Sequence, residues 1–272
     1  MKHEIYVKIC ILIALAGLYG CKSNTTKNEL HTDSTHSDTV AHTDNAHHEK
    51  HWSYEGETGP EHWSVINEEY KDCAGKQQSP VNIENASKDK TLKALQTKYT
   101  PAEKVELVNN GHTIQVNYND GIFTLNNTEY HILQFHFHTP SEHTVNGEHF
   151  PMEVHFVHAD TEGHLAVIGV LVKEGSENKF FQNFWSLLPK AKDEKSEYSN
   201  NLDITKFLPV RKNYYYLSGS LTTPPCTEGV QWFVMKNPVE ASKVQIDQIA
   251  ALMPKNNARP VQMLNDRKIL EF

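Results

Sequence analysis

Three features that identify common classes of protein are scarce in this sequence. Positive charge is in the minority, with 26 Lys and Arg against 34 Asp and Glu among 272 residues and a formal net charge of −8. No basic patch has the density that nucleic-acid binding requires, which argues against nucleic acid as a partner. The apolar run Ile9–Leu18 is too short to span a bilayer comfortably. Strand and helix patterns do not alternate as in βαβ units, which argues against a parallel α/β fold.

Cysteine is also scarce, and its four residues do not form one set. Cys10 lies in the apolar N-terminal run and Cys21 closes that run, so neither belongs to the globular part. Cys73 and Cys226 remain as an even pair in a chain that looks exported, which favours a disulfide between them. Two buried free thiols are the alternative.

The first 20 residues have the pattern of a secretory signal peptide. Lys2 and Lys8 supply positive charge ahead of the apolar core, and small residues follow it. The ending Leu18-Tyr19-Gly20-Cys21 resembles a bacterial lipobox, although Tyr19 is a less usual occupant than Ala or Ser. We therefore predict an exported cell-envelope lipoprotein, periplasmic or on the cell surface, in which acyl chains on Cys21 form the only membrane anchor. Ordinary signal cleavage, with Cys21 as a bystander, is the alternative.

Residues 21–50 have almost no apolar content and carry a loose His-x-Asp repeat. Such a segment does not bury enough apolar surface to fold, so we expect a disordered tether between the acylated cysteine and the domain. Weak capture of zinc or copper is the alternative interpretation. The histidines that would take part are His31, His36, His42, His47, His48 and His51.

Residues 51–272 are predicted to form one mainly β (α+β) domain. We expect a large, twisted, mostly antiparallel central sheet of about ten strands, with a few short peripheral helices. Helical spacing of apolar residues predicts helices over 179–188 and 242–252. The aromatic residues expected to pin the N-terminal arm are Trp52, Tyr54 and Trp63. The predicted strands are Lys104–Val108, Thr113–Tyr118, Gly121–Leu125, Glu129–His138, Glu148–Asp160, Leu165–Lys173, Asn213–Thr222 and Val230–Lys236.

Polar and aromatic residues alternate along Gln134-Phe135-His136-Phe137-His138. In an extended strand this places both histidines on one face, where burial is costly unless the imidazoles bind something, and Zn²⁺ accepts neutral imidazole nitrogens. A neighbouring strand that contains His155 supplies the third ligand. Three histidines without a fourth protein ligand are typical of a catalytic zinc site. A lone His-x-His would be a weak signal.

Several separated motifs make residues 52–272 resemble an α-class carbonic anhydrase of the bacterial exported kind. The resemblance implies reversible hydration of carbon dioxide to bicarbonate and a proton, with Zn²⁺ held by His136, His138 and His155. It also places Cys73 and Cys226 where many secreted members have a bridge. The motifs are Gly59-Pro60-Glu61-His62-Trp63, Gln78-Ser79-Pro80-Val81-Asn82-Ile83, Asn110-Gly111-His112, Gln134–His138, Ser141-Glu142-His143, Glu153–His158, Gly219–Cys226 and Asn257-Ala258-Arg259-Pro260.

Further roles follow from this resemblance alone. Thr222 and the buried acid Glu142 are expected to orient the attacking oxygen, and His112 to carry the released proton to buffer. The remaining expected site residues are Gln134, Glu153 and the Asn257 carbonyl as acceptors that hold the histidine rings, Val157, Val167, Leu221, Thr223 and Trp232 around the carbon dioxide pocket, and Tyr54, Asn110 and Gln115 along the proton path.

The resemblance also implies partners and leaves alternatives. Carbon dioxide and bicarbonate are the expected substrates, sulfonamides and anions the expected inhibitors, and a homodimer one expected assembly. One alternative is a non-catalytic relative that uses the same sheet for binding, but such proteins typically lose a ligand histidine. A zinc-scavenging lipoprotein is the other alternative, and esterase activity would be a side reaction of the same site.

Overall fold

The structure is a computed structural model that describes residues 51–272, while the predicted signal peptide, Cys21 and the tether lie outside the described residues. The strands are β1 (Asn82–Ile83), β2 (Ser87–Lys88), β3 (Gln96–Tyr99), β4 (Val105–Asn109), β5 (Ile114–Asn117), β6 (Gly121–Leu125), β7 (Thr128–His138), β8 (Thr144–Val145), β9 (Glu148–His149), β10 (Met152–Ala159), β11 (Leu165–Glu174), β12 (Lys195–Tyr198), β13 (Tyr214–Ser220), β14 (Glu228–Ala241) and β15 (Leu270–Glu271). The α-helices are α2 (Trp63–Ile66), α3 (Lys179–Gln182) and α4 (Lys243–Ala250), and the 3₁₀ turns are η1 (Gly56–Thr58), η2 (Glu68–Ala74), η3 (Trp185–Leu187) and η4 (Ile204–Lys206).

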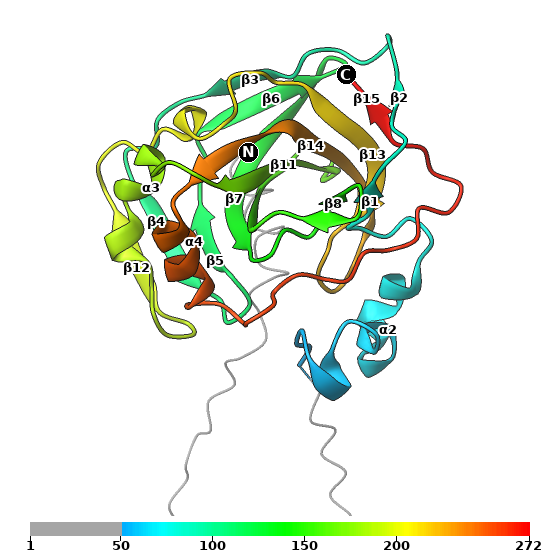
Figure 1. The fold of residues 1–272 in the computed structure, drawn as a ribbon, viewed down its shortest axis with the longest axis horizontal. Coiled ribbons are helices and arrows are strands. Elements are labelled where there is room, and N and C mark those ends of the chain that lie inside the picture. The colour runs from blue at the N-terminus through cyan, green and yellow to red at the C-terminus, as the bar shows by residue number, and fades with distance from the viewer. Residues whose placement is uncertain (1–50) are drawn as a thin grey trace, which may run out of the picture. The chain divides into compact units, whose positions relative to one another are not determined.

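Most of these strands form one large sheet. Ten strands follow the order β12-β4-β5-β7-β10-β11-β14-β13-β15-β2, and β3 and β6 extend the sheet beside β7. The β11–β14 and β15–β2 pairs are parallel, and the other pairs of this sheet are antiparallel. A small second sheet contains β1, β8 and β9. Figure 1 shows the twist of the large sheet, with α3 and α4 near its β12–β4–β5 edge. The predicted fold class is confirmed.

Three predicted strands differ from the structure by more than one residue at an end or are divided. The strand predicted over 148–160 is divided into β9 and β10, with Pro151 between them, because proline has no N–H for a sheet ladder. The strand predicted to reach Thr222 ends at Ser220, where a loop toward Cys226 begins. β14 continues past the predicted end at Lys236 to Ala241, because its pairing with β11 resumes after a register shift between Val170 and Val172.

The helix predicted over 179–188 is interrupted. α3 ends at Gln182 and η3 begins at Trp185. Phe180, Phe181 and Phe184 are nonetheless all buried, as their helical spacing predicted. The helix predicted over 242–252 forms as α4, and a capping box at Ser242 satisfies its first turn.

The two faces of the large sheet bury different side chains. On one face, Phe135 and Phe137 of β7 and Phe156 of β10 join the main apolar core. The opposite face packs a smaller apolar cluster that includes Val167 of β11 and Trp232 of β14. Strand alternation therefore sends the polar residues of β7 and β10 toward the smaller cluster.

The N-terminal arm (51–74) is held by aromatic packing and a disulfide. Trp63 is buried, and its Nε1 donates to the carbonyls of Ser53 and Thr58 at 2.9 and 3.1 Å. Trp52 contacts Trp63 edge-on, with ring centroids 5.2 Å apart. The Cys73–Cys226 disulfide joins the end of the arm to the loop after β13, so both predictions for the arm are confirmed.

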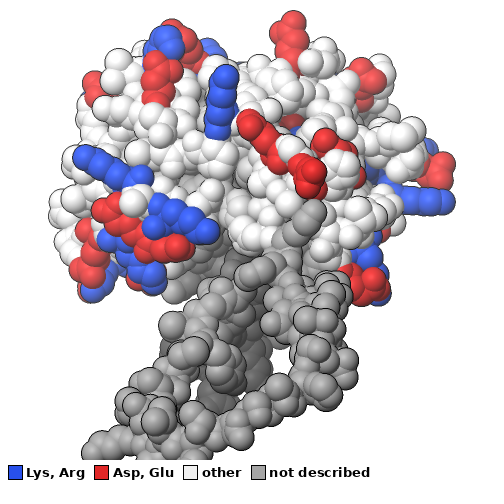
Figure 2. Space-filling model, turned by 90° about the horizontal axis from the view of Figure 1, so that it is seen from below, with Lys and Arg blue, Asp and Glu red and all other residues white. Residues whose placement is uncertain are grey.

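The described surface carries charges of both signs, and the described helices are short. Figure 2 shows one face of the molecule, on which Lys and Arg side chains are interspersed with Asp and Glu. Within residues 51–272, no helix combines the length and the apolar character needed to cross a bilayer.

His158 is fully buried on the core side of β10. Its Nε2 lies 2.8 Å from the hydroxyl of Tyr99, and Phe123 contacts the ring edge-on. Burial lowers the pKa of His158 to about 3. In the unfolded chain a histidine has a pKa of about 6.5. Between about pH 3 and pH 6.5, the unfolded chain therefore binds a proton at this residue and the folded chain does not.

This burial predicts an acid-dependent loss of stability. The contribution of neutral, buried His158 to the free energy of unfolding is complete above about pH 6.5. It falls as pH decreases toward 3, by up to about 1.4 kcal/mol per pH unit. His158→Gln, which retains a polar partner for Tyr99, is expected to flatten the pH dependence of the free energy of unfolding measured in urea. His62→Gln, at an exposed histidine, serves as the control and should retain the wild-type slope. Equal slopes for all three proteins would contradict the prediction.

Candidate metal centre

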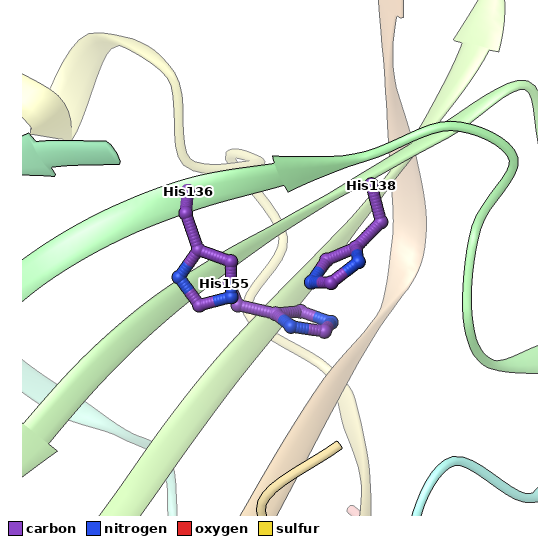
Figure 3. Close-up of side chains that lie close together, drawn as sticks. All are labelled: His136, His138 and His155. Carbon is purple, nitrogen blue, oxygen red and sulfur yellow. The ribbon is translucent and has the colours of Figure 1, made fainter. Parts of the chain in front are cut away.

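Three histidines from β7 and β10 converge on the polar side of the sheet. His136 and His138 are two residues apart on β7, and antiparallel pairing places His155 of β10 directly opposite His136. One ligand nitrogen from each residue lies within 4.8 Å of the others. Figure 3 shows the three rings turned toward one another. The predicted third ligand is therefore where the sheet register requires it to be.

Hydrogen-bond acceptors hold the rings of His136 and His138, and a carboxylate lies close to the ring of His155. Nδ1 of His136 lies 2.8 Å from Oε1 of Gln134, and Nδ1 of His138 lies 2.7 Å from the carbonyl of Asn257. Nε2 of His155 lies 3.0 Å from Oε1 of Glu153. These contacts leave Nε2 of His136, Nε2 of His138 and Nδ1 of His155 for a metal ion. Nε2 of His138 is buried and has no hydrogen-bond partner among residues 51–272, as expected of an atom that binds a cation.

The environment keeps two of the rings neutral. Burial, followed by the neighbouring rings, lowers the pKa of His136 well below its ordinary value. Burial also lowers the pKa of His138, although Glu142 opposes this effect. At His155 burial again acts to lower the pKa, but Glu153 and Glu142 outweigh it and raise the pKa. The set of three imidazoles fits Zn²⁺, which binds neutral nitrogen ligands and competes with a proton for His155.

Glu153 is buried and accepts hydrogen bonds at both oxygens. Oε2 accepts the backbone N–H groups of Glu142 and His143, each at 2.9 Å, and Oε1 lies 2.9 Å from Nδ1 of His143. Burial acts to raise the pKa of Glu153, but His143 and His155 hold it well below its ordinary value. Gly169 lies beside this carboxylate, and a Cβ there would be only 2.8 Å from Oε1. The carboxylate of Glu153 can occupy this position because residue 169 on β11 has no side chain.

Glu142 is buried beside the histidines, and its predicted partner Thr222 is also buried. Oε1 of Glu142 accepts the backbone N–H of Arg259 at 2.9 Å. Oε2 lies 3.4 Å from Nε2 of His138, and among the described residues it accepts no hydrogen bond. Thr222 is 5% exposed and lies in the loop that follows β13. Among the described residues, Oε2 of Glu142 therefore accepts no hydrogen bond from Thr222.

The residues predicted to surround carbon dioxide form part of the smaller apolar cluster. Val157, Val167 and Trp232 are buried members, and Leu221 packs against them. The Trp232 ring contacts the His155 ring, with centroids 4.8 Å apart. Thr223 is half-buried in the neighbouring loop, where its carbonyl accepts the N–H of Cys226. An apolar wall thus lies directly against one of the ligand rings.

The predicted proton-path residues come from the N-terminal arm, which contains Tyr54, and from β5 and the turn before it, which contain Gln115 and Asn110. Asn110 Oδ1 accepts the backbone N–H groups of His112 and Thr113, each at 2.9 Å. Gln115 pairs with His136 across β5 and β7. The Tyr54 ring lies 6.2 Å from that of His112, and burial, followed by Glu142, raises the pKa of Tyr54 well above its ordinary value.

Two features of the site were missed by the sequence analysis. Arg259 was noted only as part of a motif, yet its buried guanidinium donates to the carbonyls of Cys73 and Ser79 and to Oε1 of Gln78. His51 was assigned to the metal-capture alternative, yet its Nε2 lies 2.9 Å from that of His112. No local signal indicates either contact, because both join segments far apart in the sequence.

Comparisons with known proteins give one consistent result. The sequence profile of the family described as eukaryotic-type carbonic anhydrase matches residues 58–272. The carbonic anhydrase of Klebsiella pneumoniae is 43% identical over 225 residues, covering 81% of this chain and 91% of that protein. The α-carbonic anhydrase of Thermovibrio ammonificans, solved with the inhibitor sulfanilamide, matches with a TM-score of 0.78 and 44% identity over 81% of this chain and 98% of its own. Dioscorin, solved with ascorbate, matches with a TM-score of 0.77 and 30% identity over 82% of this chain and 98% of its own.

The close approach at Gly169 predicts a specific effect on metal affinity. Gly169→Ala places a Cβ 2.8 Å from Oε1 of Glu153 and displaces the carboxylate that orients His155. We expect zinc affinity, measured by competition with a chromophoric chelator, to fall by about 10- to 100-fold while the fold is retained. Gly229→Ala is the control: φ there is +90°, so alanine is strained, but the added Cβ meets nothing within 4 Å. Equal zinc affinities for the two variants would refute this role of Gly169.

Proposed function

The chain belongs to the eukaryotic-type, or α-class, carbonic anhydrases, and from this membership we propose what each residue around the three histidines contributes. The enzyme catalyses the reversible hydration of carbon dioxide, and its family uses Zn²⁺. One observation carries the proposal: the ligand atoms of His136, His138 and His155 lie within 4.8 Å of one another. A hydrogen-bonded histidine cluster would not leave the buried Nε2 of His138 without a partner.

The first role is to hold the metal. Zn²⁺, when bound, supplies a Lewis acid that acidifies water and stabilises developing negative charge. Three protein ligands are the number found in catalytic rather than structural zinc sites. Gln134, the Asn257 carbonyl and Glu153 fix the ring orientations through the 2.8, 2.7 and 3.0 Å contacts, so the ligand nitrogens are aimed before the metal arrives.

The second role is to orient the attacking oxygen. Glu142 Oε2 is a buried carboxylate oxygen with no hydrogen-bond partner within residues 51–272, which suits it to accept the hydroxyl hydrogen of Thr222. A threonine that donates to Glu142 has only lone pairs left for the reacting oxygen. It therefore accepts the hydrogen of that oxygen and directs a lone pair at carbon dioxide. The N–H of Arg259 holds the other carboxylate oxygen in place.

The third role is to bind the substrate and remove the proton. Carbon dioxide is uncharged, so the apolar wall of Val157, Val167, Leu221 and Trp232, with Thr223 beside it, binds it without competition from a charged ligand. His112 takes the proton that hydration releases, along a polar surface lined by Tyr54, Asn110 and Gln115.

A stopped-flow assay that follows acidification with a pH indicator tests this function. The zinc-loaded wild type is expected to accelerate carbon dioxide hydration, and a sulfonamide to inhibit it. His136→Ala should lower the rate on the order of a thousandfold, because the metal supplies several kcal/mol of transition-state stabilisation. His164→Ala, at an exposed histidine outside the cluster, should retain the rate. Several metal ions per chain with no hydration would favour zinc scavenging instead.

Inhibitors and assembly are proposed on chemical grounds. Sulfanilamide is bound in the Thermovibrio relative, and sulfonamides and small anions share the negative charge that a tri-histidine zinc site attracts. Both classes are therefore proposed inhibitors of this enzyme. A homodimer stays a prediction.

We also propose that the enzyme is exported and anchored by acyl chains on Cys21. The Cys73–Cys226 disulfide supports export, because such bonds persist in oxidising compartments. In fractionated cells, Cys21→Ser is expected to move the enzyme from the membrane fraction to the soluble exported fraction. Cys10→Ser is the matched control and should leave it with the membrane. An unchanged distribution of the Cys21 variant would rule out the anchor.

A further inference from the structure

Two histidines from distant parts of the chain form a direct pair at the outer end of the proton path. The Nε2 atoms of His51 and His112 lie 2.9 Å apart, and the ring centroids are 5.0 Å apart. His112 is half-buried, whereas His51 is exposed. The pair thus leads from the interior toward solvent, and it is separate from the three histidines of the metal centre.

Aromatic packing holds the His112 ring in place. Trp52 stacks on it with ring centroids 3.7 Å apart and planes inclined by 12°. Trp52 is itself packed edge-on against the buried Trp63, and the ring of Tyr54 contacts His112 from another side. A swing of His112 toward solvent would break this stack. A proton on His112 therefore leaves most readily through a partner that already touches the ring.

The surroundings also disfavour storage of a proton on His112. Burial, followed by His51 and Lys192, lowers the pKa of His112 to about 4. Relative to an ordinary histidine with a pKa of about 6.5, the ring holds a proton roughly 300-fold less well. Burial and Lys192 also lower the pKa of His51, but that ring faces buffer. A proton that reaches His112 is passed on rather than retained.

We propose that His51 is the outer station of the proton path, accepting the proton that His112 releases and delivering it to buffer. This inference rests on the proposed role of His112. The incoming proton binds Nδ1 of His112 while its Nε2–H proton moves across the 2.9 Å contact to Nε2 of His51. His51 then loses its Nδ1–H proton to a buffer base. Exchange of ring protons with water restores the starting tautomers, so one proton leaves per cycle.

His51→Gln tests the relay, because glutamine hydrogen-bonds to His112 but does not take up and release a proton at neutral pH. The measurement is the rate of carbon dioxide hydration by the full zinc-loaded chain over a series of buffer concentrations. We expect kcat to fall on the order of fivefold in weak buffer, since His112 still exchanges protons with water. Concentrated buffer should restore kcat. kcat/KM for carbon dioxide should stay at the wild-type value, because proton export follows the hydration step.

Three further variants separate a relay from a structural effect. His62→Gln, at an exposed histidine of the same arm, should show the wild-type dependence on buffer. His112→Ala should be slower in weak buffer than His51→Gln, and the double variant should match His112→Ala because His51 acts after His112. A wild-type buffer dependence for His51→Gln, or a fall in kcat/KM, would overturn the relay. Inactive wild type, indistinguishable from His136→Ala, would overturn the proposed function instead.

Discussion

The antiparallel register between β7 and β10 is the constraint on which the site depends. It sets His155 opposite His136 and Glu153 opposite His138, so that ligands and the carboxylate that orients them share one face. A slip of one residue would turn that face over and exchange the histidines for Phe135 and Phe137. Because those phenylalanines are buried in the main core, apolar packing on one side of the sheet determines metal geometry on the other.

A dense set of buried charges surrounds this register. Glu142, Glu153 and Arg259 are each almost fully buried, and burial of an ion costs several kcal/mol before compensation. Backbone N–H groups and histidines compensate the carboxylates, and carbonyls compensate the guanidinium. Arg259 also connects the arm, through the Cys73 carbonyl, to the backbone N–H that holds Glu142. The network holds these buried groups beside the three histidines with a rigidity that an apolar core alone would not supply.

The N-terminal arm completes the site rather than simply covering it. Its Trp52 stacks on His112, and the disulfide ties its end to the loop that carries Thr222. The arm thus contacts the residue proposed to export the proton and is joined covalently to the loop of the residue proposed to orient the attacking oxygen. A short segment with little regular structure has this effect because Trp63 anchors it in the interior.

The sequence by itself determined the features that local pattern controls. Period-two alternation predicted β7 and the common face of His136 and His138, and the motifs indicated the family and therefore the third ligand. Long-range contacts needed the tertiary structure. The Asn257 carbonyl that holds His138, 119 residues away, was expected from the family resemblance and not from any local pattern, and the partner of His112, His51, 61 residues away, was not expected at all. Neither contact leaves a local pattern, since a backbone carbonyl is the same in every residue and an exposed histidine resembles any other. The interruption of the helix predicted over 179–188 also needed the tertiary structure, because apolar spacing predicts which face of a segment is buried and not where its hydrogen-bonding pattern changes.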